Sequence, residues 1–218
     1  MILRKAVLGL ALTTAVGGAA FAGEPVKIGM ITTLSGGGSS LGIDIRDGFQ
    51  LALIQEGGTL GGYEVELIVE DDARKPANAV QIAQRMMKRE EVDIMTGIVW
   101  SNLAMAVVPK VTRDGVIYIS PNAGPSELAG AQCHENYFNV AWQNDNLHEA
   151  IGQYVTDKGY GNVFIMAPNY PAGKDALTGF KRYYAGGLAG EIYTKLGQKD
   201  YAAEIAALKA AGPDVVFF

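Results

Sequence analysis

The chain has 218 residues, of which 49% are hydrophobic and 19% are charged, and its formal net charge is −5. This composition can build a substantial apolar core, and an acidic chain gives no indication of a nucleic-acid-binding protein or of one that binds an acidic membrane surface. The 28 glycines suit a fold with many tight turns between strands and helices.

The N-terminal segment has the pattern of a secretory signal peptide. Arg4 and Lys5 form a short cationic region, residues 6–20 are apolar and uncharged, and Ala20-Phe21-Ala22 supplies a small-x-small cleavage pattern. A transmembrane anchor needs about 20 strongly apolar residues, whereas this stretch is shorter and diluted by Thr and Gly. The residue directly after the cleavage site is Gly23 rather than Cys, so a lipid anchor is not indicated. We expect cleavage and a soluble mature protein outside the cytoplasm.

Strands and helices alternate along the rest of the chain. Apolar runs predict strands, and apolar residues at helical spacing predict helices between them. We expect strands at residues 26–32, 63–69, 92–96, 116–119, 162–167, 191–194 and from 214 onward. We expect helices at residues 43–55, 77–90, 101–113, 146–157, 174–184 and 201–210. This alternation predicts right-handed crossovers and open parallel sheets with helices on both faces.

An irregular stretch at residues 120–145, rich in Pro and Gly, is the natural place for the chain to pass from one sheet to another. We therefore predict an α/β fold with two doubly wound parallel-sheet lobes. The expected division is a signal peptide at 1–22, an N-terminal ligand-binding lobe at 23–141 and a partial second lobe at 142–218. A buried parallel strand needs a neighbour and a loop beyond it, and a strand that begins at Pro213–Phe218 would leave backbone groups and apolar side chains at an edge. We therefore expect the sequence to be truncated and the second lobe incomplete.

Three polar segments follow predicted strands. Ligands bind beyond the carboxyl ends of the strands in open α/β sheets, which makes these segments candidates for a binding site. They are Thr33–Ser40, Trp100-Ser101-Asn102 and Ser120–Pro125.

Ser101 is a candidate N-cap for the helix that follows it. A ligand carboxylate placed there would gain about 0.3–1 kcal/mol from the helix dipole and about 1.5–3 kcal/mol from each charge-assisted hydrogen bond. The alternative is that Ser101 only caps its own helix. The neighbouring Asn102 and Trp100 favour a ligand site, since an exposed Trp beside polar anchors suits an apolar or aromatic ligand.

Other motifs of catalysis or cofactor binding are incomplete. The glycines of 36–42 lack the third glycine of a dinucleotide-binding loop, where Leu41 stands, and 172–175 lacks the Ser/Thr of a phosphate-binding loop. His134 and His148 do not form a metal site with Cys133, and no hydrolase elbow is present. We therefore predict no enzymatic activity, no cofactor and no metal.

Four segments in order resemble one family, the extracytoplasmic solute-binding proteins of ABC importers, in the leucine/isoleucine/valine-binding group. They are KIGMITTLSGGGSSLGIDIRDGFQLAL, GIVWSNLAMAVVP, GVIYISPNAGPSEL and KDYAAEIAALKAAGPDVVFF. The resemblance as a whole runs from Val26 to Phe218. The resemblance implies the periplasmic binding protein type I fold, with a ligand enclosed between two lobes. It also implies a small carboxylate ligand, an ABC permease as partner, no nucleic acid and a monomer.

The resemblance also implies the site residues. The carboxylate-binding Ser of the family matches Ser101, its turn after the next strand matches Asn122, Ala123 and Gly124, and its second-lobe aromatic matches Tyr170. The ligand-binding candidates are then Ser101, Asn102, Trp100, Asn122, Ala123, Gly124, Tyr170 and Ser35.

Two ligand classes and two roles stay open. Amino-acid binders carry a Thr where this chain has Gly124, and the Trp100 triplet resembles the subgroup that binds aromatic carboxylates, which slightly favours an aryl acid over a branched-chain or hydrophobic amino acid. The acid that would fix a ligand ammonium would lie beyond Phe218. A ligand-sensing ectodomain or regulator on the same fold is the alternative to transport.

Overall fold

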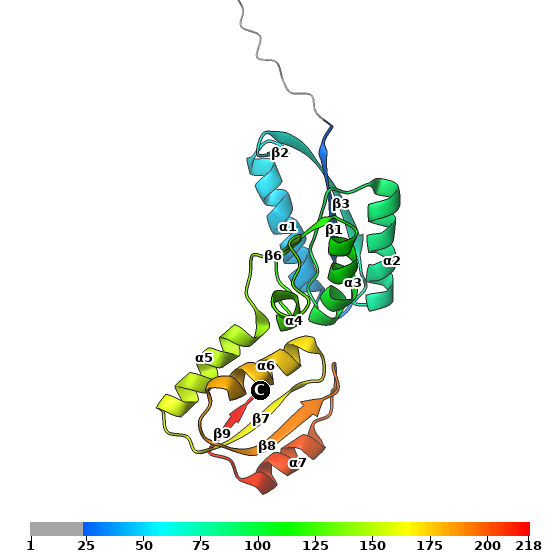
Figure 1. Cartoon of the computed structure of the whole chain (residues 1–218). Helices are drawn as coiled ribbons and strands as arrows, with labels where there is room; N and C mark the ends of the chain where they lie inside the picture. The colour runs from blue at the N-terminus through cyan, green and yellow to red at the C-terminus, as the bar shows by residue number, and fades with distance from the viewer. Residues whose placement is uncertain (1–23) are drawn as a thin grey trace, which may run out of the picture.

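A computed structural model describes residues 24–218, so the signal peptide expected at 1–22 lies outside the described residues. The chain forms two α/β lobes, one built on a six-stranded sheet and the other on a three-stranded sheet (Figure 1). The predicted α/β class with two open, largely parallel sheets is confirmed.

The first lobe has the sheet order β2-β3-β1-β4-β5-β6. All neighbours pair in parallel except β2 and β3, which form an antiparallel edge. Its strands are β1 (Val26–Thr32), β2 (Thr59–Leu60), β3 (Tyr63–Asp71), β4 (Ile94–Thr96), β5 (Ile117–Ser120) and β6 (Tyr137–Asn139). Its helices are α1 (Ser39–Gln55), α2 (Pro76–Arg85), which continues into a π-helical turn (Met86–Glu90), α3 (Ser101–Arg113) and α4 (Ser126–Ala129).

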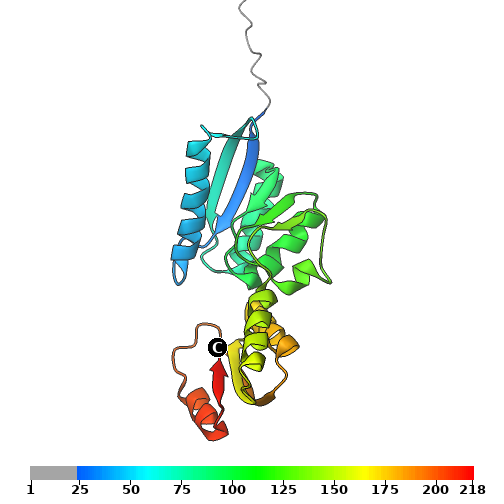
Figure 2. The ribbon, with the colours of Figure 1, turned by 90° about the vertical axis from the view of Figure 1, so that its left-hand side faces the viewer.

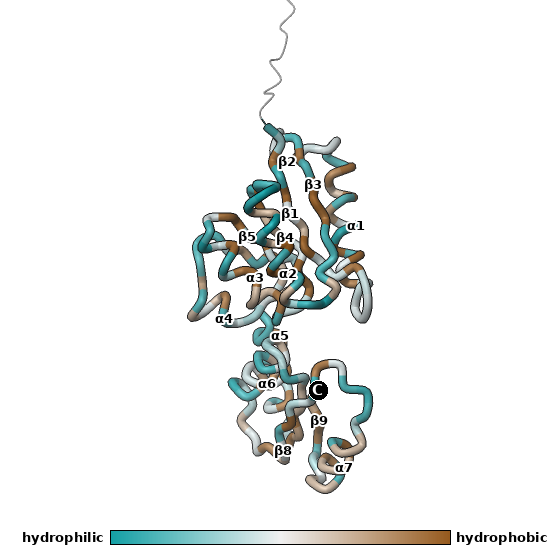
Figure 3. Tube along the Cα trace, turned by 90° about the vertical axis from the view of Figure 1, so that its right-hand side faces the viewer, coloured by the Kyte–Doolittle hydropathy of each residue, from teal (hydrophilic) through white to brown (hydrophobic). Residues whose placement is uncertain are grey.

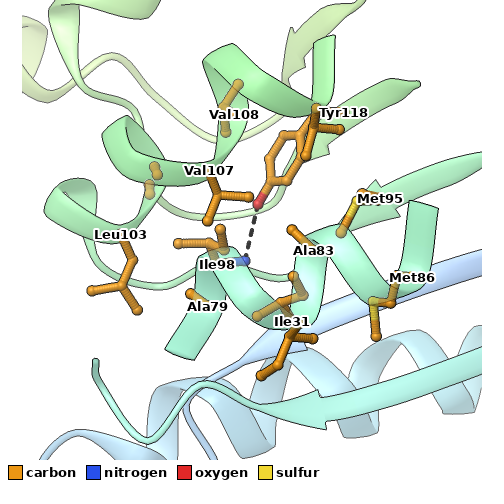
Figure 4. Close-up of a cluster of buried hydrophobic side chains, with 14 of the residues drawn as sticks. Ile31, Ala79, Ala83, Met86, Met95, Ile98, Leu103, Val107, Val108 and Tyr118 are labelled. Carbon is orange, nitrogen blue, oxygen red and sulfur yellow. Dashed lines mark hydrogen bonds between the residues drawn. The ribbon is translucent and has the colours of Figure 1, made fainter. Parts of the chain in front are cut away.

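The main core of the first lobe lies between the sheet and helices α2 and α3. Ile31, Met86, Met95 and Leu103 are fully buried there, and α1 covers the opposite face of the sheet (Figure 2). Tyr118 is the largest buried side chain of this core, and its hydroxyl accepts a hydrogen bond from the Ile98 N–H at 3.2 Å (Figure 4). This bond anchors the backbone just after β4, at the start of the segment that leads into α3.

The second lobe has the sheet order β8-β7-β9, and both pairings are parallel. Helices α5 and α6 cover one face, whereas α7 lies on the other (Figure 2). Its elements are α5 (Asn144–Asp157), β7 (Asn162–Pro168), α6 (Pro171–Tyr183), β8 (Gly187–Thr194), α7 (Ala202–Ala211) and β9 (Val215–Phe217). Figure 3 shows hydrophobic stretches along the sheet strands, β3 among them, and polar ones on many outer turns.

Several predicted boundaries differ from the structure. Helix α1 begins at Ser39 rather than residue 43, β3 runs on to Asp71, and β8 begins at Gly187 rather than 191. Helix α6 begins at Pro171 rather than residue 174. A proline fits the first turn of a helix, because the backbone N–H groups of that turn form no hydrogen bond within the helix. The stretch at 120–145, predicted to be irregular, contains α4 and β6, which are too short to produce a periodic pattern.

Within residues 24–218, no helix is both long enough and apolar enough to cross a lipid bilayer.

Candidate functional site

The candidate site lies at the carboxyl ends of the parallel strands of the first lobe. After β1 the chain passes to β3 on one side of β1 and then returns to β4 on the other side. The loops that follow β1 and β4 therefore leave the sheet in opposite directions, at a topological switch point, where ligands bind in open α/β sheets. Side chains tie these loops together. The Trp100 Nε1–H donates to Thr33 Oγ1 at 3.1 Å, and the Asn122 Nδ2–H donates to the Val99 carbonyl at 2.8 Å.

Ser101 is the first residue of α3, and Trp100 occupies the N-cap position. The prediction that Ser101 caps its own helix is wrong. The N-cap is the preceding residue, Trp100, whose carbonyl accepts hydrogen bonds from the N–H groups of Leu103 and Ala104 at 2.9 Å each. The Ser101 hydroxyl instead accepts a hydrogen bond from Asn144 Nδ2 at 3.1 Å.

The start of α3 offers free donors beside this hydroxyl. Within the described residues, the backbone N–H groups of Ser101 and Asn102 donate to no protein acceptor, as is usual in the first turn of a helix. They lie at the positive end of the helix dipole, where an anionic group is favoured.

A polar network connects this helix start to the second lobe. Asn144, at the first position of α5, donates to both Ser101 Oγ and Asp175 Oδ2, the latter at 2.9 Å. The same Asp175 oxygen accepts the Ser126 N–H at 3.1 Å. Asn144 and Asp175 are both buried, so the two lobes meet at a buried carboxylate with two donors.

A cavity of about 180 Å³ lies next to this network, between the lobes. The first lobe contributes Val99, Ser101, Asn122 and Ala123 to its lining. The other lining residues lie between residues 142 and 172, and they are Trp142, Asn144, Leu147, His148, Tyr170 and Ala172. Four of the eight predicted ligand residues therefore lie together at one cavity: Ser101, Asn122, Ala123 and Tyr170.

The structure places the other four predicted residues away from the cavity lining. Trp100 packs against Gly38, where an added Cβ would lie 2.5 Å from the indole ring. Gly124 packs against the backbone of Trp142, and a Cβ added at Gly124 would lie 1.9 Å from the Trp142 carbonyl oxygen. The Asn102 Oδ1 is buried without a hydrogen bond among the described residues. Ser35 is exposed in the loop after β1.

Six lining residues were not among the predicted ones. They are Val99, Trp142, Asn144, Leu147, His148 and Ala172. Asn144 is the first residue of α5, after the N-cap Gln143, and the sequence does not show that its amide reaches across to Ser101 and Asp175. His148 was considered only as a metal ligand. Among residues 24–218, no cluster of side chains has the composition of a metal site.

Two titratable groups of the cavity have shifted pKa values. Burial lowers the pKa of His148, and the negative charges of Asp145 and Asp175 partly oppose that effect. Burial raises the pKa of Tyr170, and the positive charge of Arg74 opposes the increase. At neutral pH both groups are therefore uncharged, and so are the other lining side chains.

A larger groove, of about 590 Å³, lies beside β9 and α7. Its lining is mostly apolar and includes Met166, Ile205, Leu208 and Phe218. We assign the candidate site to the smaller cavity, because only there do hydrogen-bonding groups converge at the carboxyl ends of strands.

The arrangement of two α/β lobes around a polar cavity defines the class of two-lobed binding proteins. The family model of the periplasmic binding proteins matches residues 25–218, so the chain belongs to that family. A curated relative, Leu/Ile/Val-binding protein homolog 3 of Brucella melitensis biotype 1, is 27% identical, and the alignment covers 98% of this chain and 59% of the relative.

Two solved structures are similar to this chain. An ABC transporter solute-binding protein from R. palustris, in complex with benzoate, has 28% identity and a TM-score of 0.82, over 89% of this chain and 55% of that one. A branched-chain amino acid transporter substrate-binding protein from Streptococcus pneumoniae, in complex with isoleucine, has 25% identity and a TM-score of 0.77, over 89% of this chain and 57% of that one. This chain thus spans somewhat more than half the length of the proteins it matches.

Proposed function

We propose that this protein is the periplasmic solute-binding component of an ABC importer and that it captures a small aromatic carboxylate between its two lobes. The observation that carries the proposal is the start of α3. Ser101 lines the cavity there, beside two free backbone N–H groups and opposite Tyr170 of the second lobe.

A carboxylate fits this position for electrostatic reasons. Each charge-assisted hydrogen bond to it contributes about 1.5–3 kcal/mol, and the helix N-terminus adds about 0.3–1 kcal/mol. Two or three such bonds amount to a large part of the roughly 8 kcal/mol of a micromolar site. Membership of the periplasmic binding protein family supports binding rather than chemistry as the role of the cavity.

The remaining lining supports an aromatic acid over an amino acid. Trp142, Tyr170 and Leu147 offer apolar surface for a ring. The similar benzoate complex agrees with this choice. A branched-chain amino acid is the second candidate, favoured by the similar isoleucine complex.

The test is calorimetric titration of the mature full-length protein with benzoate, 4-hydroxybenzoate, leucine and isoleucine, with benzamide as an uncharged analogue of benzoate. We expect benzoate or its hydroxyl derivative to bind at micromolar concentration and benzamide to bind at least tenfold more weakly. If only leucine or isoleucine binds, the ligand is an amino acid and not an aromatic carboxylate. A protein that binds no small carboxylate would refute the proposal.

The role in transport has its own test. A solute-binding component should stimulate ATP hydrolysis by its reconstituted permease and ATPase in the presence of ligand. If the liganded protein instead acts on a receptor or kinase and leaves the permease unaffected, the sensing alternative replaces transport.

A further inference from the structure

Arg74 is a half-buried cation without an acceptor among the described residues. It lies in the turn after β3, and its guanidinium carbon is 4.0 Å from the centroid of the Trp100 ring. Within residues 24–218 the guanidinium forms no ion pair and donates no hydrogen bond. An arginine head carries five N–H donors, and stacking on an indole uses none of them.

The turn that carries Arg74 has an unusual backbone. Ala73 and Arg74 adopt φ values of 50° and 58°, which side-chain-bearing residues seldom adopt. Two carboxylates fix this geometry, since Asp71 Oδ1 accepts the Ala73 N–H at 2.8 Å and Asp72 Oδ1 accepts the Arg74 N–H at 2.7 Å. Backbone held in sparsely populated conformations concentrates at ligand-binding sites.

The position of Arg74 relates it to the cavity. Strand β3 is two positions from β4 in the sheet, so their ends are about 10 Å apart. The Arg74 side chain extends along this edge, over Trp100 and beside Gly37, where an added Cβ would lie 3.3 Å from Arg74 Nη1. Its charge also acts on the hydroxyl of Tyr170, which lines the cavity.

Two separate places can therefore attract an anion, one at the cavity and the other on the Trp100 ring, outside the cavity lining. One is the uncharged set of donors at Ser101, and the other is the fixed positive charge of Arg74. We propose that Arg74 binds a second carboxylate of the ligand and that the preferred ligand is an aromatic dicarboxylate, with one carboxylate at each end of the ring. This inference rests on the proposed function, because it assigns the first carboxylate to Ser101.

The test compares ligands of equal length and different charge. The mature full-length protein is titrated with benzene-1,4-dicarboxylate, with its monomethyl ester and with benzoate. The variants are Arg74→Gln and Arg74→Lys, with Lys75→Gln as the control that removes one exposed positive charge from the adjacent residue. Thermal melting confirms that each variant is folded.

We expect the wild type to prefer the dicarboxylate over its monoester at least tenfold. Arg74→Gln should reduce this preference to twofold or less while changing benzoate affinity less than threefold, Arg74→Lys should keep part of it, and Lys75→Gln should keep all of it. If benzoate binds and the preference is absent or survives in Arg74→Gln, the assignment of Arg74 is wrong and the proposed function stands. If none of the three acids binds, both proposals fail.

Discussion

Asn144 donates one hydrogen bond to Asp175 Oδ2 at 2.9 Å and another to Ser101 Oγ at 3.1 Å. One buried amide thus connects the binding helix of the first lobe to α6 of the second. A rearrangement of the lobes that separates α3 from α6 has to break at least one of these bonds.

We expect Asn144→Ala to lower the free energy of unfolding by about 1–3 kcal/mol, because a buried carboxylate loses one of its two donors. Urea denaturation of the wild type and the variant measures this difference. The control is Asn146→Ala, an exposed residue on the same helix, which should change stability by less than about 0.5 kcal/mol. Equal effects of the two substitutions would contradict the role of the network.

Ser101→Ala should weaken benzoate binding tenfold or more, since it removes a hydroxyl from the proposed carboxylate site beside the start of α3. Titration calorimetry gives the two dissociation constants. Ser40→Ala, on the exposed side of α1, is the control and should leave the affinity unchanged. An unaltered affinity in Ser101→Ala would remove Ser101 from the site.

His148 should make stability depend on pH in the weakly acidic range. Burial lowers its pKa in the folded state, so below about pH 6.5 the unfolded chain binds a proton that the folded chain does not. The stability associated with the neutral imidazole is therefore present above about pH 6.5 and is lost as the pH falls through the lowered folded-state pKa.

The measurement is urea denaturation of the wild type and of His148→Gln at pH 7.5 and pH 5.5. The wild type should lose more stability than the variant between these two values. If both lose the same amount, His148 does not contribute to the pH dependence.

Two glycine substitutions should have opposite effects. Gly124→Ala places a methyl group 1.9 Å from the Trp142 carbonyl and should lower stability by about 1–3 kcal/mol or more, because the crossing segment has to move. Gly48→Ala in α1 meets no atom within 4 Å and should raise stability by about 0.5–1 kcal/mol. Thermal denaturation of both variants tests the pair, and a stable Gly124→Ala would show that this contact can relax.

Much of the fold could be predicted from the sequence, because apolar periodicity is a local property. The strand at Val26–Thr32 and the start of α3 at Ser101 agree with their predicted bounds. Strand β6 could not be found in this way, because its three residues are half-buried or exposed and its place is set only by pairing with β5.

For the candidate site, too, some features could be predicted from the sequence and others appear only in the tertiary structure. The positions of Ser101, Asn122 and Ala123 after strands of the first sheet follow from the sequence, since parallel strands of one sheet end at one edge. Tyr170, which follows a strand of the second sheet, was predicted from the family resemblance. Their convergence on one cavity with Trp142 and His148, and the hydrogen bonds of Asn144 across the lobes, depend on how the chain crosses from one sheet to the other. The sequence alone thus determined the alternating strands and helices and the polar residues that follow them. Only the tertiary structure decided which of these residues share a cavity and that Arg74 lies on Trp100, because such contacts join segments whose separation along the chain carries no periodic signal.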